Sequence, residues 1–186
     1  MLEFKDITQE SIEKQQLVKD LYLTAFPEHE RLTFSFILDR AKLDQNYLVA
    51  IEDDNQFIGL VYYTISGKNL LISYLAMDPS TRSKGYGTRV LEQFKEKYQD
   101  KTIFLEIEEV IKNADNYTQR VKRQSFYERN GFGKSNIYMK TDTEGHGLEI
   151  MTTKPITFAD YKDAVTTYLG QDNMSEWNSY FEPVIR

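Results

Sequence analysis

The chain has 186 residues, of which 40% are hydrophobic, and this is enough for one domain with a buried core. Its net charge of -6 argues against a general nucleic-acid binder. The charge is compatible with a cationic ligand such as an amine, but solubility alone also accounts for it. The sequence has no cysteine, which excludes disulfides and cysteine-bound metals, and His29 and His146 form no metal motif. The N-terminus lacks the apolar run of a signal peptide, and no segment reaches the ~18 apolar residues of a membrane span. We therefore expect a cytoplasmic protein with no metal, nucleic-acid or membrane partner.

The N-terminal region predicts one strand and two helices. The strand is expected over residues 2–7, and the following helix ends at Phe26 because Pro27 disfavours helical geometry in the residue before it. A second helix is expected over residues 32–41. The first helix has apolar residues near helical spacing at Ile12, Leu17, Leu21 and Ala25.

The middle of the chain predicts a run of strands and then a helix. Apolar segments bounded by turn residues give three strands, at Tyr47–Ile51, Phe57–Ile65 and Leu70–Met77. The helix is expected over Gly85–Tyr98, with Val90, Leu91 and Phe94 as core contacts. A fourth strand is expected over Thr102–Glu108, where residues alternate between two faces. Its two expected faces are Ile103, Leu105 and Ile107 on one side and Phe104, Glu106 and Glu108 on the other.

The C-terminal third predicts two more helices and two more strands. A helix over residues 116–129 stops at Asn130-Gly131, which is typical of a helix C-terminus. Strands are expected near 132–140 and 147–153, joined by the polar loop Thr141–Gly147. Thr157-Phe158-Ala159-Asp160 resembles a capping box that opens a last helix, and an aromatic tail follows it. The element order β-α-α-β-β-β-α-β-α-β-β predicts an α/β sandwich with a mixed sheet.

The segment between Asp78 and Thr88 has the character of an anion site. A strand leads into a loop with Gly85 and Gly87, where a helix begins. Glycines let backbone N–H groups approach a ligand, and a helix N-terminus adds free donors and partial positive charge. Arg82, Lys84 and Arg89 add positive charge, so the segment suits a pyrophosphate.

Two common nucleotide motifs do not fit this loop. A P-loop needs a lysine after its second glycine, whereas Lys84 precedes both glycines, and the third glycine of a Rossmann fingerprint is missing. The pattern Arg82-x-x-Gly85-x-Gly87 instead resembles the Q/R-x-x-G-x-G/A signature of the GNAT N-acetyltransferase superfamily. That resemblance implies a three-layer α/β/α fold with a mostly antiparallel sheet over residues 1–155. Residues 156–186 lie beyond it, and their helical and aromatic character predicts an extension that packs on the domain or on a partner subunit.

The resemblance also implies acetyl-CoA as cosubstrate. Its implied contacts are Leu75, Ala76, Met77, Arg82, Ser83, Lys84, Gly85, Tyr86, Gly87 and Thr88. In the family an asparagine often lies seven residues before a conserved tyrosine and contacts the cofactor. Here Arg120 occupies that position, which puts the usual contact in doubt and suggests an additional positive charge near the phosphates.

A second part of the signature lies at the end of the 116–129 helix. Tyr127 and Gly131-Phe132 match the family's Y-x-x-x-G-F pattern, in which the tyrosine often protonates the departing thiolate. A packing role at the helix end is the alternative for Tyr127. Glu106 is the first candidate for the general base and Glu108 the second, because a carboxylate in a partly dry cleft has a raised pKa.

The segment between the first two helices commonly borders the acceptor pocket in GNAT folds. It supplies the expected acceptor residues Phe26, Glu28, Glu30, Arg31 and Phe34, and Glu108 completes that set. We therefore expect a monomeric or homodimeric enzyme that moves acetyl to the primary amine of a small molecule or peptide. An acyl-CoA-binding or sensing protein without turnover is the alternative, and the acceptor's identity stays open.

Overall fold

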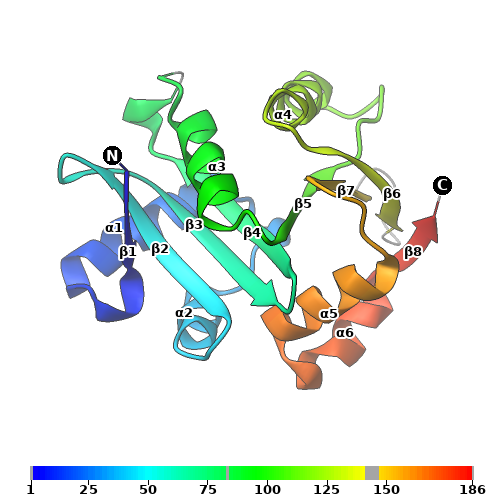
Figure 1. The fold of residues 1–186 in the computed structure, drawn as a ribbon, viewed down its shortest axis with the longest axis horizontal. Coiled ribbons are helices and arrows are strands. Elements are labelled where there is room, and N and C mark those ends of the chain that lie inside the picture. Colours follow the sequence, from blue (N-terminus) through cyan, green and yellow to red (C-terminus); the bar gives the residue numbers. More distant parts are fainter. Residues whose placement is uncertain (1, 83, 141–146, 186) are drawn as a thin grey trace. The chain divides into compact units, whose positions relative to one another are not determined.

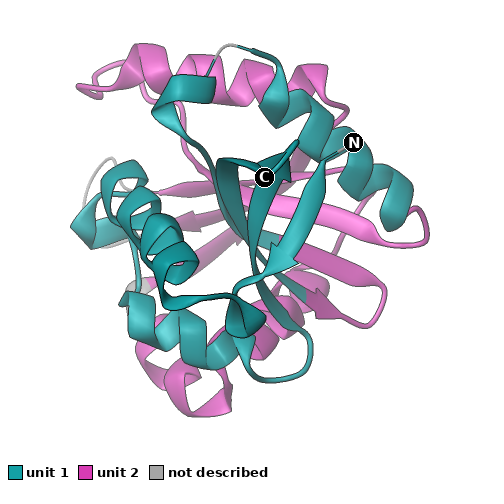
Figure 2. Ribbon diagram, turned by 90° about the vertical axis from the view of Figure 1, so that its left-hand side faces the viewer, with its two compact units in different colours: residues 1–64, 72–98 teal, residues 65–71, 99–186 magenta. Residues whose placement is uncertain are grey.

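The computed structural model describes residues 2–82, 84–140 and 147–185, and within these the side chain of Tyr180 is not described. The chain forms two compact units, which Figure 2 colours separately. Unit 1 comprises Met1–Thr64 and Ile72–Tyr98, and unit 2 comprises Ile65–Leu71 and Gln99–Arg186. The tip of one β-hairpin therefore belongs to unit 2 although its two strands run largely through unit 1.

The sheet of unit 1 follows the chain from edge to edge. Its strands lie in the order β1 (Glu3–Asp6), β2 (Asn46–Asp53), β3 (Gln56–Ser66) and β4 (Asn69–Met77), as Figure 1 shows. The pairs β1–β2 and β2–β3 are antiparallel. The β2–β3 turn has Asp54 and Asn55 at φ 49° and 62°, the left-handed geometry that two-residue hairpin turns require.

Helices cover both faces of this sheet because adjacent strand residues point to opposite sides. Tyr62 of β3 contacts Tyr74 of β4, which in turn packs against Tyr22 of α1 (Ile12–Ala25). The next residue, Tyr63, contacts Phe94 of α3 (Tyr86–Lys97) at a ring separation of 5.0 Å. The other helical elements of unit 1 are α2 (Phe34–Ala41) and the short 3-10 turns Ile7–Gln9, Glu28–Glu30 and Pro79–Thr81.

The buried face of α1 differs from the apolar spacing read in the sequence. Ile12 and Leu17 are 81% and 51% exposed, whereas Val18, Leu21 and Tyr22 are buried. Positions 18, 21 and 22 follow the i, i+3, i+4 spacing of one helix face. Around the helix, residue 12 lies about 130° and residue 17 about 90° from the centre of that face. Tyr22 therefore contributes to the core at a position that the aliphatic pattern did not mark.

Unit 2 contains the remaining strands, in the order β5 (Thr102–Glu108), β7 (Leu148–Thr152), β6 (Gly133–Lys140) and β8 (Glu182–Ile185). These neighbours all pair antiparallel. Its helices are α4 (Tyr117–Arg129), α5 (Phe158–Leu169) and α6 (Met174–Tyr180), with a 3-10 turn at Gln171–Asn173. The strand β8 was not expected from the sequence, and it adds to β6 of the same chain with Ile137 opposite Ile185.

The predicted capping box at the start of α5 is confirmed. The Thr157 hydroxyl accepts from the Asp160 N–H, and the Asp160 carboxylate accepts from the Thr157 N–H at 2.9 Å. Asn69, at the hairpin tip in unit 2, donates to the same carboxylate at 3.0 Å. The start of α5 is therefore fixed both by its own cap and by a residue 91 positions away in sequence.

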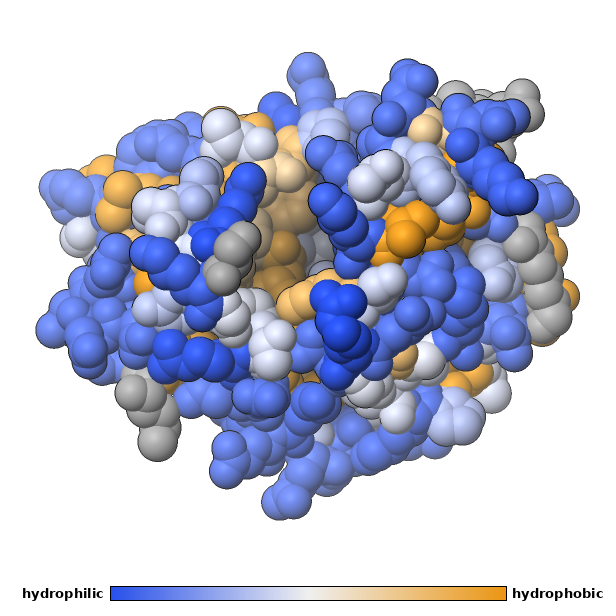
Figure 3. All heavy atoms as spheres, turned by 90° about the horizontal axis from the view of Figure 1, so that it is seen from above, coloured by the Kyte–Doolittle hydropathy of each residue, from blue (hydrophilic) through white to orange (hydrophobic). Residues whose placement is uncertain are grey.

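The mixed α/β fold and nearly all of its predicted elements are confirmed within the described residues. The predicted loop Thr141–Gly147 lies outside them except for Gly147. Hydrophilic side chains cover most of the face seen in Figure 3, as expected for a chain with 28% charged residues. In the described part of the chain, no helix is both long and apolar enough to span a membrane.

Candidate functional site

The predicted anion loop begins directly after β4 and ends at the first turn of α3. Gly85 precedes the helix at φ 79°, in the left-handed region that glycine adopts without strain. A Cβ added to Gly85 would meet no heavy atom within 4 Å, so the loop is open on that side. The first turn of α3 contains no acidic residue and has no side-chain cap, which leaves its leading N–H groups for an anion.

The base of this loop is held by short polar contacts. Thr81 is buried, and its hydroxyl donates to the carbonyl oxygens of Ile58 and Asp78. The Asp78 carboxylate accepts from the Ser80 hydroxyl at 2.6 Å and from the Ser80 N–H at 2.9 Å, and these hydrogen bonds keep the pKa of Asp78 below its usual range. The loop therefore presents a fixed backbone to a ligand.

The cations near the loop have different surroundings. Arg82 is exposed, and its Nε donates to the Met77 carbonyl oxygen at 3.4 Å, while Lys84 is exposed. Arg89, by contrast, pairs with Asp53 at 3.0 Å and lies over the Tyr86 ring at 5.0 Å. Arg89 is thus engaged with the β2–β3 turn, and Arg82 and Lys84 carry the positive charge of the loop itself.

The remaining predicted cofactor residues of unit 1 fall into three groups. Leu75 and Met77 are half-buried in β4, whereas Ala76 is buried and its carbonyl oxygen faces Gly59 so closely that a Cβ on Gly59 would lie 2.4 Å away. Tyr86 donates its hydroxyl to Asp53 at 3.1 Å. Gly87 and Thr88 lie in the first turn of α3, and Ser83 lies outside the described residues.

Tyr127 lies in the last turn of α4, in unit 2. Its ring packs between Phe126 and Phe132, with centroids at 5.1 and 5.7 Å, and the Phe132 N–H donates to its carbonyl oxygen. Gly131, at φ 84°, makes the turn that brings Phe132 back onto Tyr127. Burial raises the pKa of Tyr127 to about 12, and its hydroxyl has no hydrogen-bond partner within the described residues. The hydroxyl therefore stays protonated at neutral pH and is available to a ligand.

Glu106 of β5 is half-buried. Burial raises the pKa of its carboxyl, and a hydrogen bond from the Tyr161 hydroxyl of α5 opposes that rise. Phe104, on the same face of the strand, packs against Tyr161 with the two ring centroids 6.3 Å apart. The residue opposite Glu106 on β7 is Ile150.

Glu108, two residues further along β5, has the opposite electrostatics. Its carboxylate pairs with Arg120 at 2.9 Å and with Arg123 at 2.7 Å, and it accepts from Asn116 at 2.9 Å. Burial raises its pKa, but the Asn116 hydrogen bond and the two arginines outweigh burial and hold it below the usual range. Glu108 is thus a stable anion.

Arg120, predicted near the cofactor phosphates, is buried in unit 2. Its guanidinium donates to the Glu109 carbonyl oxygen at 2.8 Å and to the Asn116 side chain at 2.6 Å, besides pairing with Glu108. These contacts join α4 to the end of β5 and give Arg120 a structural role.

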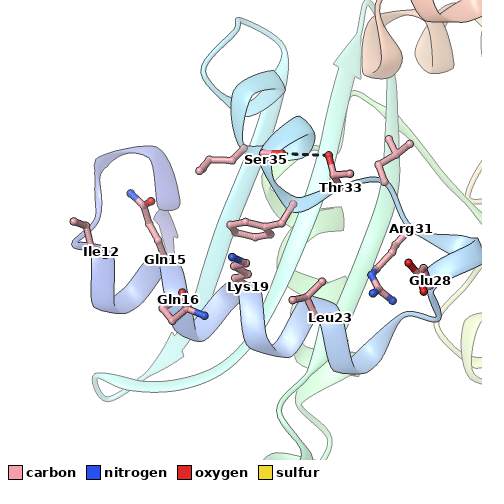
Figure 4. Close-up of a pocket in the computed structure, with 12 residues that line it drawn as sticks. Ile12, Gln15, Gln16, Lys19, Leu23, Glu28, Arg31, Thr33 and Ser35 are labelled. Carbon is pink, nitrogen blue, oxygen red and sulfur yellow. Dashed lines mark hydrogen bonds between the residues drawn. The ribbon is translucent and has the colours of Figure 1, made fainter.

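The predicted acceptor segment borders a cavity of about 720 Å³ in unit 1. Figure 4 shows it between one side of α1 and the chain leading into α2, with Lys19 and Leu23 on α1 facing Thr33 and Arg31. Of the predicted acceptor residues, Glu28, Arg31 and Phe34 line it. Phe26 and Glu30 do not: Phe26 packs on Tyr22 and Tyr74, and Glu30 pairs with His29 at 3.5 Å. Glu108 belongs to unit 2.

Two kinds of residue were missed by sequence reasoning. Lys19 and Leu23 line the cavity from the same side of α1 as Ile12, and a helical projection of residues 12–25 would have placed them together. The sequence predicted no functional role for Tyr161. Its contact with Glu106 joins residues 55 positions apart, and no local pattern indicates it.

The middle of the chain matches the sequence model of a known protein family. Residues 44–134 match the family model described as an acetyltransferase (GNAT) domain, a range that includes both the Arg82–Thr88 loop and Tyr127. The predicted resemblance to the GNAT superfamily is therefore confirmed for this segment of the chain. No protein among those with curated descriptions matches the sequence.

Solved structures with the same fold include several acetyltransferases. A Bacteroides thetaiotaomicron protein assigned to the GNAT family is 21% identical at a TM-score of 0.75, covering 91% of this chain and 99% of its own. An aminoglycoside 6'-N-acetyltransferase complexed with coenzyme A is 16% identical at 0.64, with coverages of 84% and 99%. The ribosomal-protein-S18-alanine N-acetyltransferase of Escherichia coli is 16% identical at 0.59, with coverages of 82% and 92%.

Proposed function

We propose that this protein transfers the acetyl group of acetyl-CoA to a primary amine. The observation that carries the proposal is the open, glycine-containing loop at the N-terminus of α3, with Arg82 and Lys84 beside it. An added Cβ on Gly85 would enter open space, so a diphosphate can approach the backbone there. The structure of an aminoglycoside acetyltransferase with coenzyme A, which shares this fold, supports the same cosubstrate.

The chemistry requires a base and a proton donor. The acceptor enters as an ammonium ion and must lose a proton before its nitrogen attacks the thioester carbonyl. The C–N bond then forms and the C–S bond breaks. The attacking nitrogen loses its second proton, and the departing thiolate takes up a proton. In our proposal Glu106 accepts the first proton, and the Tyr127 hydroxyl donates to the departing thiolate.

The two carboxylates of β5 are not equivalent as bases. A base is most useful when its pKa lies near the working pH. Burial raises the pKa of Glu106 in that direction, whereas Asn116 and two arginines hold the pKa of Glu108 down. This difference favours Glu106, and it assigns Glu108 to the anchoring of α4.

The properties of Tyr127 suit a donor rather than a base. With its pKa raised to about 12, the hydroxyl is neutral at pH 7 and donates a hydrogen bond to the developing negative charge on sulfur. The Gly131-Phe132 turn fixes the ring by edge packing.

For the acceptor we propose the cavity of unit 1. Leu23 and Phe34 offer apolar contact to the carbon skeleton of an amine, and Glu28 offers a carboxylate to its charge. A Glu28→Gln variant should raise KM for the amine severalfold with kcat little changed, because this contact acts in binding alone. Equal loss in kcat would place Glu28 in the chemistry instead.

The decisive experiment follows release of free CoA thiol with a panel of amines, including aminoglycosides and polyamines. Turnover with at least one amine is expected, and Tyr127→Phe should lower kcat about 10²-fold. Tyr117→Phe is the matched control, since Tyr117 lies on the same helix and is 38% exposed. Saturable CoA binding without turnover on any amine would favour the sensing alternative, and full activity of Tyr127→Phe would remove Tyr127 from the mechanism.

A further inference from the structure

The C-terminal extension brings a buried hydroxyl to the carboxylate of Glu106. The Tyr161 hydroxyl of α5 donates to Glu106 Oε1. Tyr161 lies outside residues 44–134, which match the family model, so this contact comes from a part of the chain that the family model does not cover. Both residues belong to unit 2.

The Tyr161 side chain has little freedom to move. It is 1% exposed, and its ring contacts Phe104, Phe158 and Trp177 at centroid distances of 6.3, 6.3 and 6.1 Å. The preceding residue, Asp160, closes the capping box of α5 and accepts from Asn69. The hydroxyl is therefore presented to β5 from a fixed helix.

The surroundings of Glu106 make this single donor important. Across the strand pair, β7 offers it the apolar side chain of Ile150. The nearest carboxylate along β5, Glu108, is compensated by Arg120 and Arg123. Glu149, the β7 neighbour of Ile150, forms an ion pair with Lys134 and accepts a hydrogen bond from the Tyr138 hydroxyl. On α5, the side chains of Lys162 and Asp163 are exposed. Within the described residues, Tyr161 is thus the hydrogen-bond donor that favours the charged form of Glu106.

A base in such a site needs two properties at once. Its proton affinity must be high enough to take a proton from an ammonium ion, and burial provides this. It must also be ionised and correctly oriented at the start of each cycle, and a buried carboxylate without a donor would remain protonated. A neutral hydroxyl with a strongly raised pKa of its own provides a hydrogen bond without adding a charge.

We propose that Tyr161 is a positioning residue, which holds the Glu106 carboxylate ionised and in a fixed orientation. This inference rests on the proposed acetyltransferase function. It makes α5 part of the catalytic apparatus rather than a packing extension. Tyr161 acts through Glu106 and does not itself touch the reacting atoms.

The test compares Tyr161→Phe with the wild-type protein across pH. Loss of the hydroxyl raises the proton affinity of Glu106 roughly tenfold, so the acidic limb of kcat/KM moves to higher pH while the plateau changes less. The matched control is Tyr138→Phe, because Tyr138 is also buried and donates to a carboxylate, that of Glu149 at 2.9 Å. This control should leave the acidic limb in place.

A second readout does not depend on turnover. NMR titration of the ¹³C-labelled carboxyl of Glu106 should show its midpoint at higher pH in Tyr161→Phe than in wild type. An unchanged midpoint and an unchanged acidic limb would overturn the inference even in an active enzyme. If the wild-type protein acetylates no amine, the proposed function fails, and with it the catalytic meaning of the contact. The titration still decides separately whether Tyr161 controls the ionisation of Glu106.

Discussion

Asp160 offers a quantitative test of how α5 is anchored. Its carboxylate accepts from the Thr157 N–H at 2.9 Å, the Thr157 hydroxyl at 2.7 Å and Asn69 at 3.0 Å. These hydrogen bonds lower the pKa of Asp160 to about 2. Against an unfolded value of about 3.9, the shift corresponds to roughly 2.5 kcal/mol, which solvent screening at this partly exposed site reduces to about 1–2 kcal/mol.

Asp160→Ala should therefore lower the free energy of unfolding at pH 7 by about 1–2 kcal/mol, measured by urea denaturation. The lowered pKa means that this stability is present above the unfolded pKa and is lost as pH falls through the folded one. About half of the difference between wild type and variant should have disappeared at pH 3. Asp163→Ala, an exposed position on the same helix, is the control and should change little. A difference that stays constant from pH 7 to pH 3 would refute the electrostatic account of this anchor.

Three further predictions concern the arginines and Glu106. Arg120→Ala should lower the free energy of unfolding by about 3 kcal/mol, and Arg123→Ala should lower it by less than about 1 kcal/mol, because the two side chains are 7% and 43% exposed. Equal losses in urea denaturation would contradict this. Arg82→Ala should raise the dissociation constant for CoA about tenfold in calorimetry, whereas Lys97→Ala, at the other end of α3, should leave it unchanged. Glu106→Gln should abolish most turnover. At pH 8 the same variant should have a free energy of unfolding higher than wild type by on the order of 1 kcal/mol, because a group with a raised folded pKa loses its stabilising effect as pH rises through that pKa. Lower stability of the variant at pH 8 would count against a desolvated carboxylate.

The parts of the fold that the sequence predicted are those determined by local chemistry. The α1 terminus before Pro27, the hairpin turns and the α5 capping box each depend on a few adjacent residues. The anion loop belongs to the same class, because Gly85 and the start of α3 are neighbours. The strand β8 was missed, since Glu182–Ile185 has a proline and a glutamate and becomes a strand only by pairing with β6.

The parts of the candidate site that could not be predicted depend on contacts distant in sequence. The sequence suggested that Arg120 adds positive charge near the cofactor phosphates, and its burial became clear only from Glu108 and Glu109 beside it. The difference between Glu106 and Glu108 as bases likewise arises from partners on α5 and α4 rather than from their own strand. Side-chain electrostatics of this kind follows from packing, which periodicity does not encode.

The central claim is that a diphosphate binds at the open side of Gly85, and CoA calorimetry on two glycine variants tests it most directly. Gly85 and Gly67 have φ values of 79° and 58°, and an added Cβ meets nothing within 4 Å at either, so alanine imposes a similar backbone strain on both. We predict that wild type and Gly67→Ala bind CoA with the same dissociation constant and that Gly85→Ala binds at least about tenfold more weakly. Absence of CoA binding by the wild-type protein, or equal affinity in all three proteins, would contradict the account.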